Sequence, residues 1–132
     1  MIFEGLFAAI QPMTILLIAI GTIVGIIFGS IPGLTATMAI VMFLPVTYSM
    51  TASQGISMLM ALYIGGISGG LISAILLNIP GTPSSVATCF DGKPLADKGE
   101  AGKALGTGVV FSFVGTMIGV GLLILLTPVL CN

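Results

Sequence analysis

The chain is apolar over nearly its whole length, with one short polar segment in its last third. Charged residues are absent between Glu4 and Asp91, an interval several times longer than the roughly 20 residues needed for one helical crossing of a bilayer. Residues 13–20 and 120–127 are apolar on all sides, without the alternation that marks a transmembrane β-strand. Because only helices and closed barrels satisfy their backbone groups in lipid, the pattern predicts an all-α integral membrane protein.

Glycine and proline divide the apolar sequence into about four hydrophobic helical segments, at residues 13–29, 34–50, 54–79 and 104–128. The second segment is short and contains Pro45, so it fits either a full crossing or a re-entrant segment. The third is long enough to cross, but its glycines at 65–70 weaken it as a continuous helix. The fourth segment is the clearest span.

The distribution of polar residues predicts four regions along the chain. An N-terminal segment, 1–12, is expected to lie along the membrane interface with Glu4 in water. Residues 13–90 are expected to form paired helix–Pro-Gly–helix membrane units. Residues 91–103 contain every charged residue except Glu4 and are predicted to form a polar loop. All three lysines lie in that loop, so the positive-inside rule places it in the cytoplasm. Residues 104–132 are predicted to form a transmembrane helix and the C-terminal end.

Ile-Pro-Gly occurs twice, at residues 31–33 and 79–81, and both copies interrupt apolar segments. Small residues precede the two copies at matching positions, which indicates either duplication of one unit or coincidence in a glycine-rich chain. The chain returns to its starting side before residue 54 whether residues 13–50 form a hairpin or two crossings. The helices that lead into the two Pro-Gly breaks are therefore predicted to run in the same direction and to converge on one region.

The Pro-Gly breaks are the first candidates for chemistry. Proline lacks an N–H and glycine permits positive φ, so neither helix continues through its break. Backbone groups freed at membrane depth need protein or water partners, and broken helices of this kind bind substrates and ions in many secondary transporters. Hydroxyl side chains follow each break: Thr35 and Thr37 in the first, and Thr82, Ser84, Ser85 and Thr88 in the second. Such groups can bind the oxygens of an anion beside a helix N-terminus. The alternative is an interfacial turn in which they cap the next helix.

Other features have simpler interpretations. Asn78 is either a ligand or ion contact beside the second break or a side chain that ties two helices together. The glycines spaced by four from Gly21 to Gly33 predict close helix packing, and Tyr63 is interpreted as an aromatic residue of the membrane interface. The chain has no histidine, two distant cysteines and no basic cluster. It therefore predicts no metal site, resident cofactor, nucleic-acid partner or enzymatic activity.

Residues 63–106 resemble the signature region of the large permease subunit of tripartite tricarboxylate transporters. The matching pieces are Tyr63 with its glycine pairs, ILLNIPG at 75–81, the turn around Asp91-Gly92, and residues 98–106. Upstream, GTIVGIIFGSIPGLTAT (21–37) and the following LPVT (44–47) resemble the N-terminal Pro-Gly region of that family. The resemblance covers essentially the whole chain.

This resemblance implies the N-terminal part of the permease of a binding-protein-dependent, ion-coupled secondary transporter in the bacterial inner membrane. It implies a small membrane subunit and a periplasmic solute-binding protein as partners, and import of tricarboxylates such as citrate or of related carboxylates. Coupling would be to Na⁺ or H⁺ rather than to ATP. The candidate substrate-binding residues carried over from the family are Pro32, Gly33, Thr35, Asn78, Pro80, Gly81 and Ser84.

The chain also departs from the family. The large subunit is several times longer, so we expect a fragment, a truncated gene product or one piece of a split subunit. The alternative function is a helical membrane piece with a packing role only and no transport on its own. Leu71 occupies a position where the family commonly has a hydroxyl, and Ser68 one where an aromatic is frequent. The absence of arginine removes any bidentate carboxylate clamp.

Overall fold

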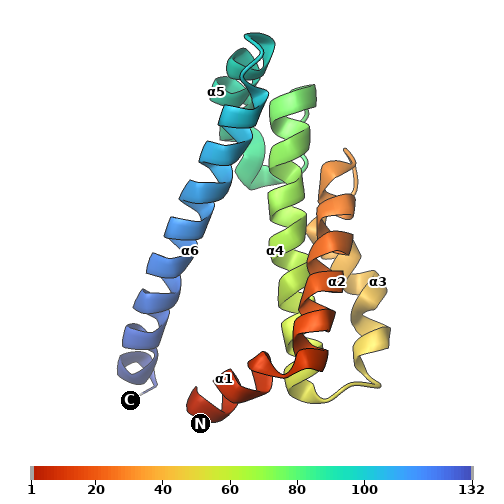
Figure 1. Ribbon diagram of the computed structural model, residues 1–132, viewed down its shortest axis with the longest axis vertical. Coiled ribbons are helices and arrows are strands. Elements are labelled where there is room, and N and C mark those ends of the chain that lie inside the picture. Colours follow the sequence, from red (N-terminus) through yellow and green to blue (C-terminus); the bar gives the residue numbers. More distant parts are fainter. Residues whose placement is uncertain (1, 132) are drawn as a thin grey trace.

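The computed structural model describes residues 2–131, and within this range every regular element is helical (Figure 1). The elements are α1 (Ile2–Ile10), α2 (Pro12–Ser30), α3 (Ala36–Thr47), α4 (Ala52–Leu77), the 3₁₀ turn η1 (Pro83–Ser85), α5 (Val86–Asp97) and α6 (Ala101–Leu130). The apolar helices α2, α3, α4 and α6 confirm the predicted all-α fold with about four hydrophobic segments. By length and composition, α2, α4 and α6 are each able to cross a membrane, which makes the chain a multi-pass membrane protein.

Helix α4 is the central element and contacts α1, α2, α3, α5 and α6. Figure 1 shows α2 and α4 running in the same direction, with α3 returning beside them and α6 returning from the far end. This confirms the predicted common direction of the helices that lead into the two breaks. Helix α3 has 12 residues, about 18 Å at 1.5 Å per residue, so it is too short to cross a hydrocarbon core of about 30 Å.

A glycine seam joins α2 to α4. Its members are Gly21, Gly25 and Gly29 of α2 and Gly65, Gly66 and Gly69 of α4, all buried. A Cβ atom on Gly21 would lie 2.9 Å from the carbonyl oxygen of Met58, and one on Gly25 would lie 2.9 Å from the backbone nitrogen of Gly66. No side chain fits at these positions, so the seam confirms the predicted close packing of backbones.

The same seam corrects the expectation that α4 is weakened at residues 65–70. The helix is continuous through this stretch, with 26 residues in all. A glycine in a helix interior costs about 1 kcal/mol relative to alanine. Here that cost is offset because the absence of side chains lets α2 approach the backbone of α4, and van der Waals packing drives association between membrane helices.

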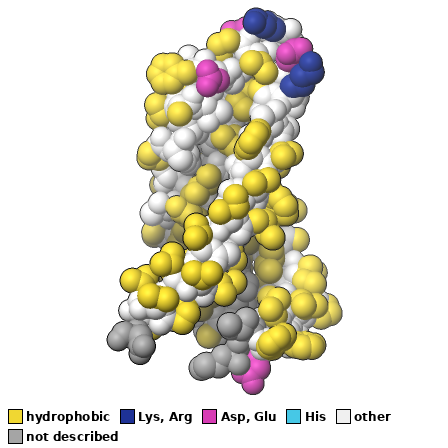
Figure 2. All heavy atoms as spheres, turned by 90° about the vertical axis from the view of Figure 1, so that its left-hand side faces the viewer, with side chains coloured by type: hydrophobic (Ala, Val, Ile, Leu, Met, Phe, Trp, Pro, Cys, Tyr) yellow, Lys and Arg dark blue, Asp and Glu magenta, His cyan; other side chains and the backbone are white. Residues whose placement is uncertain are grey.

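The polar segment 91–103 is largely helical, which corrects its prediction as a loop. Helix α5 extends to Asp97 and α6 begins at Ala101, leaving only residues 98–100 between them. Ion pairs one turn apart, Lys93 with Asp97 and Glu100 with Lys103, lie along these helix ends. Charged residues indicate exposure to water rather than irregular structure, and a solvated helix tolerates them equally well. Figure 2 shows the charged side chains of this segment gathered at one end of the molecule.

Candidate functional site

The two Pro-Gly breaks meet beside α4. After α4 ends, the chain folds back so that Gly81 packs between the end of α2 and the last turns of α4. A Cβ atom on Gly81 would lie 2.7 Å from the carbonyl oxygen of Gly29, 2.8 Å from Ser73 Oγ and 3.1 Å from the Cα of Gly70. The predicted convergence of the two helix ends on one region is therefore confirmed.

The length of α4 shows where along this helix the two breaks meet. Gly70 lies before the end of α4 at Leu77 by about 10 Å, at 1.5 Å per residue. The whole helix is about 39 Å long, which exceeds the roughly 30 Å of a hydrocarbon core. Both breaks thus lie alongside the central helix rather than beyond its end.

Hydroxyl side chains from the two breaks line one cavity of about 420 Å³. We call this cavity the hydroxyl groove, and its lining residues are Thr35, Ala36, Thr37, Tyr63, Ile67, Thr82, Pro83 and Ser84. None of these residues is charged. The groove therefore offers hydroxyl and backbone groups, with an aromatic and an aliphatic side chain from α4 as its opposite wall.

Two helical segments begin at this groove. Thr35 is the N-cap of α3, and its Oγ1 accepts a hydrogen bond of 3.3 Å from the backbone N–H of Met38. At the second break, the backbone N–H of Thr82 donates to Ser85 Oγ at 3.2 Å, and Ser85 Oγ donates to the carbonyl oxygen of Thr82 at 2.8 Å. Thr35 and Ser85 therefore cap the helical segments that follow the two breaks. Capping also brings the positive ends of two helical segments to one cavity, an arrangement that favours negative charge.

The structure brings together some of the carried-over residues and separates others. Thr35 and Ser84 line the hydroxyl groove. Gly81 is buried at the contact between the breaks, where it contributes only backbone. Gly33 has a φ of 96°, and a Cβ there would meet nothing within 4 Å, so its function is to form the turn. Pro32 is exposed beside it.

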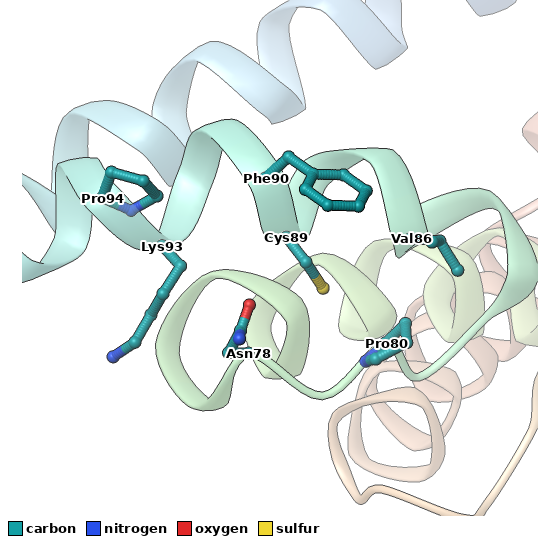
Figure 3. A pocket seen from close by; sticks show the side chains of 7 residues that line it. All are labelled: Asn78, Pro80, Val86, Cys89, Phe90, Lys93 and Pro94. Carbon is teal, nitrogen blue, oxygen red and sulfur yellow. The ribbon is translucent and has the colours of Figure 1, made fainter.

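Asn78 and Pro80 line a different cavity, of about 380 Å³, between the end of α4 and α5 (Figure 3). Asn78 ends α4 in the left-handed conformation, with a φ of 57°, which asparagine adopts more readily than most residues. Figure 3 shows the side chains of Asn78 and Cys89 pointing toward one another across this space. The conformation of the backbone accounts for an asparagine at this position without a ligand.

Lys93 also lines this second cavity and stabilises the end of α4. Its Nζ donates to the carbonyl oxygen of Leu76 at 3.3 Å and pairs with Asp97 at 2.9 Å. A cation at a helix C-terminus satisfies a free carbonyl group and interacts favourably with the helix dipole. The positive charge in this cavity therefore stabilises the packing of α5 on α4.

Three hydroxyl-bearing residues of the hydroxyl groove were not among the carried-over candidates: Thr37, Tyr63 and Thr82. A local signal existed for the two threonines, because each break is followed by two hydroxyl residues spaced by two, 35 and 37 in one and 82 and 84 in the other. Tyr63 was interpreted as an interface residue, whereas it lies in the middle of α4 and faces the groove. Tyr63 lines the groove because the chain after the second break folds back beside it. Nothing in the local sequence predicts that fold-back.

Comparisons with known proteins identify a family and a related sequence. Residues 15–132 match the tripartite tricarboxylate transporter TctA family. An uncharacterised 52.8 kDa protein in the TAR-I ttuC' 3' region of Agrobacterium vitis is 36% identical over 128 residues. That alignment covers 97% of this chain and 26% of the relative, so the chain spans about a quarter of the relative's length. No solved structure matches. Because the family match covers nearly all of its sequence, this chain belongs to the tripartite tricarboxylate transporter TctA family.

Proposed function

We propose that the chain is the N-terminal part of the permease of a binding-protein-dependent, ion-coupled secondary transporter, and that the hydroxyl groove binds its carboxylate substrate. Family membership supports the transporter class. The observation behind the site is the meeting of two Pro-Gly breaks at one hydroxyl-lined cavity alongside α4. Tricarboxylates such as citrate, or related carboxylates, are the proposed cargo.

The chemistry of the groove suits a carboxylate that must be released again. Hydrogen bonds from hydroxyl and backbone N–H groups to a carboxylate contribute about 1.5–3 kcal/mol each, because the acceptor is charged, whereas a lysine or arginine would add the attraction of a full positive charge. A groove without lysine or arginine would therefore hold an anion selectively but not tightly. In this proposal Thr35 and Ser84 contact the substrate, together with Thr37 and Thr82, while Pro32, Gly33, Pro80, Gly81 and Asn78 shape the backbone around it.

We further propose a bacterial inner-membrane location, with the charged end around residues 91–103 in the cytoplasm. Its three lysines support this orientation. The proposed partners are a small membrane subunit and a periplasmic solute-binding protein that delivers the substrate from the opposite side. Na⁺ or H⁺ is the proposed coupling ion.

Uptake by the complete complex, reconstituted in proteoliposomes, tests the groove. Thr37→Val and Ser84→Ala, made together in the permease, are expected to reduce citrate uptake by at least tenfold, since several kcal/mol of hydrogen bonding would be lost. Thr116→Val is the matched control, because this exposed threonine lies on α6 and bonds only to the carbonyl oxygen of Ser112 in the part of the chain described. Uptake that is unchanged in the double variant, at equal membrane insertion, would contradict the proposed site.

The alternative, a packing role without transport, is tested in the same preparation. If the chain has a packing role only, altering the groove should leave carboxylate uptake by the complex unchanged. Only the stability of the protein should then decrease. A second measurement, thermal unfolding of the double variant in detergent, separates these outcomes. Loss of uptake with an unchanged unfolding midpoint supports the substrate site and excludes a packing role for the two hydroxyls.

A further inference from the structure

An apolar groove of about 460 Å³ lies between α2 and α4, separate from the hydroxyl groove. We call it the α2/α4 groove, and its walls include Ile18 and Thr22 of α2 and Ser57, Met60, Ala61 and Ile64 of α4. None of these six residues is charged, and the hydroxyl of Thr22 donates to the carbonyl oxygen of Ile18 at 2.8 Å. The α2/α4 groove is therefore suited to a hydrophobic segment rather than to a polar ligand.

The α2/α4 groove lies on the side of α4 that α6 contacts. A Cβ atom on Gly108 of α6 would lie 3.5 Å from Leu71 Cδ1 of α4. Ile64 precedes Leu71 by seven residues, about two helical turns, so both residues lie on one face of α4. Figure 1 shows that α6 moves away from α4 toward the end of the molecule opposite the charged segment. The face of α4 that contacts α6 at Leu71 therefore continues as an open groove at Ile64 and Met60.

A stripe of small residues on α6 faces the same space. Its members are Gly108, Ser112, Gly115 and Gly119, and their spacing of four, three and four places them on one side of the helix. Among the described residues, a Cβ atom on Gly115 or Gly119 would meet nothing within 4 Å. In the glycine seam between α2 and α4, by contrast, a Cβ atom on any of the glycines would lie within 3.0 Å of a backbone atom. The stripe on α6 is thus a packing surface of the same kind, without a partner in the described part of the chain.

A polypeptide helix explains this combination of surfaces. Glycine weakens the interior of a helix, and small residues spaced by four allow a second helix backbone to approach closely in a membrane. Any polypeptide at this depth has to satisfy its own backbone groups, so it is helical. The relative from Agrobacterium vitis supplies the source, because the aligned part is 26% of its length. About three quarters of a permease of that size lies outside the segment that matches this chain.

We propose that the α2/α4 groove and the small-residue stripe of α6 together receive one transmembrane helix from the remainder of the permease. This helix would bury the face of α6 that leaves α4 exposed at Met60 and Ile64, and would hold α6 beside the α2–α4 pair along its whole length. The inference rests on the proposed function only in taking the chain as the N-terminal part of a longer permease. It requires neither substrate binding in the hydroxyl groove nor a particular coupling ion.

Photo-crosslinking in membranes that contain the complete permease identifies the occupant. Met60 lines the α2/α4 groove and is 57% exposed, so benzoylphenylalanine in its place is expected to cross-link to a segment of the same polypeptide outside residues 1–132, identified by mass spectrometry. Cross-linking to a second copy of the permease, to lipid alone or only within residues 1–132 would overturn the proposal. Because uptake is not measured, failure here is distinct from failure of the hydroxyl groove, which the Thr37 and Ser84 variants test.

A second measurement compares two glycines of α6 by thermal unfolding in detergent. In the complete permease, Gly119→Leu is expected to lower the midpoint by roughly 2 °C or more, because the new side chain overfills the contact with the docked helix. Gly121→Leu is the matched control, since Gly121 lies on the far side of α6 from Gly119 and a Cβ there also meets nothing within 4 Å of the described residues.

The 132-residue chain alone shows whether the effect depends on the rest of the permease. In this chain both leucine variants are expected to keep or raise the wild-type midpoint, because leucine favours a helix more than glycine does. A Gly119→Leu permease as stable as the Gly121→Leu permease would overturn the proposal. An equal loss for Gly119→Leu in the chain alone would do the same, since the contact would then lie within these 132 residues.

Discussion

Gly81 offers the sharpest test of the contact between the two breaks. In Gly81→Ala the new methyl group would lie 2.7 Å from the carbonyl oxygen of Gly29 and 3.1 Å from the Cα of Gly70. Both neighbours are backbone atoms, so relief requires movement of the chain rather than rotation of a side chain. Overpacking of this kind costs typically 1–3 kcal/mol, here roughly the upper half of that range because the glycine seam fixes α2 against α4.

The substitution also disturbs a buried hydrogen bond. Ser73 Oγ would lie 2.8 Å from the new methyl group, and it donates to the carbonyl oxygen of Gly70 at 3.1 Å. Loss of that bond adds about 1 kcal/mol. The expected total is therefore a loss of roughly 3–4 kcal/mol in the free energy of unfolding, combining overpacking and the lost bond.

Thermal unfolding in detergent is the assay, followed by size-exclusion chromatography of the soluble fraction. The Gly81→Ala midpoint is expected to fall by roughly 5 °C or more. Gly115→Ala is the matched control, since a Cβ on Gly115 of α6 would meet nothing within 4 Å and alanine favours a helix by about 1 kcal/mol. A Gly81→Ala protein as stable as the Gly115→Ala protein would refute the close contact of the two breaks.

Two further predictions concern the end of α4. Asn78→Gly is expected to retain both stability and uptake because glycine adopts positive φ freely, whereas Asn78→Ala should lose about 1 kcal/mol on thermal unfolding; loss of uptake by a stable Asn78→Gly variant would instead show that the amide contacts substrate. Lys93→Met is expected to lose about 0.5–1 kcal/mol, through the hydrogen bond to Leu76 and the dipole of α4, and Lys93→Arg should recover it. An unchanged Lys93→Met midpoint would contradict the proposed stabilisation of the helix end.

The sequence by itself determined the environment, the secondary-structure class and the position of both breaks. These depend on composition and on local backbone chemistry. A stretch without charge from 5 to 90 is stable only in lipid, and a proline without an N–H followed by a glycine is a strong local signal that a helix ends nearby. The common direction of α2 and α4 was also predicted from sequence, on the premise that residues 13–50 form a hairpin or two crossings. In the structure α2 is long enough to cross and α3 is not, and the direction holds because α3 still returns beside α2.

Sequence reasoning was wrong where a tertiary contact opposed a local preference. Helix α4 continues through residues 65–70 because the glycine seam recovers in packing what those glycines lose in helix propensity. The charged segment 91–103 is mostly helical because Gly92 and Lys93 attach α5 to α4. Neither contact is visible locally, since each joins residues that are distant in the chain.

The candidate site was decided only by the tertiary structure. Thr35 and Ser84 were predicted as site residues, but their shared cavity exists because the chain after Asn78 folds back along α4. That fold-back depends on Gly81, where a Cβ atom would lie 2.7 Å from the carbonyl oxygen of Gly29 and 3.1 Å from the Cα of Gly70. A sequence shows that glycines are present; which backbones they allow to touch depends on the position of all three in space, and that contact brings the hydroxyls of the two breaks into one groove.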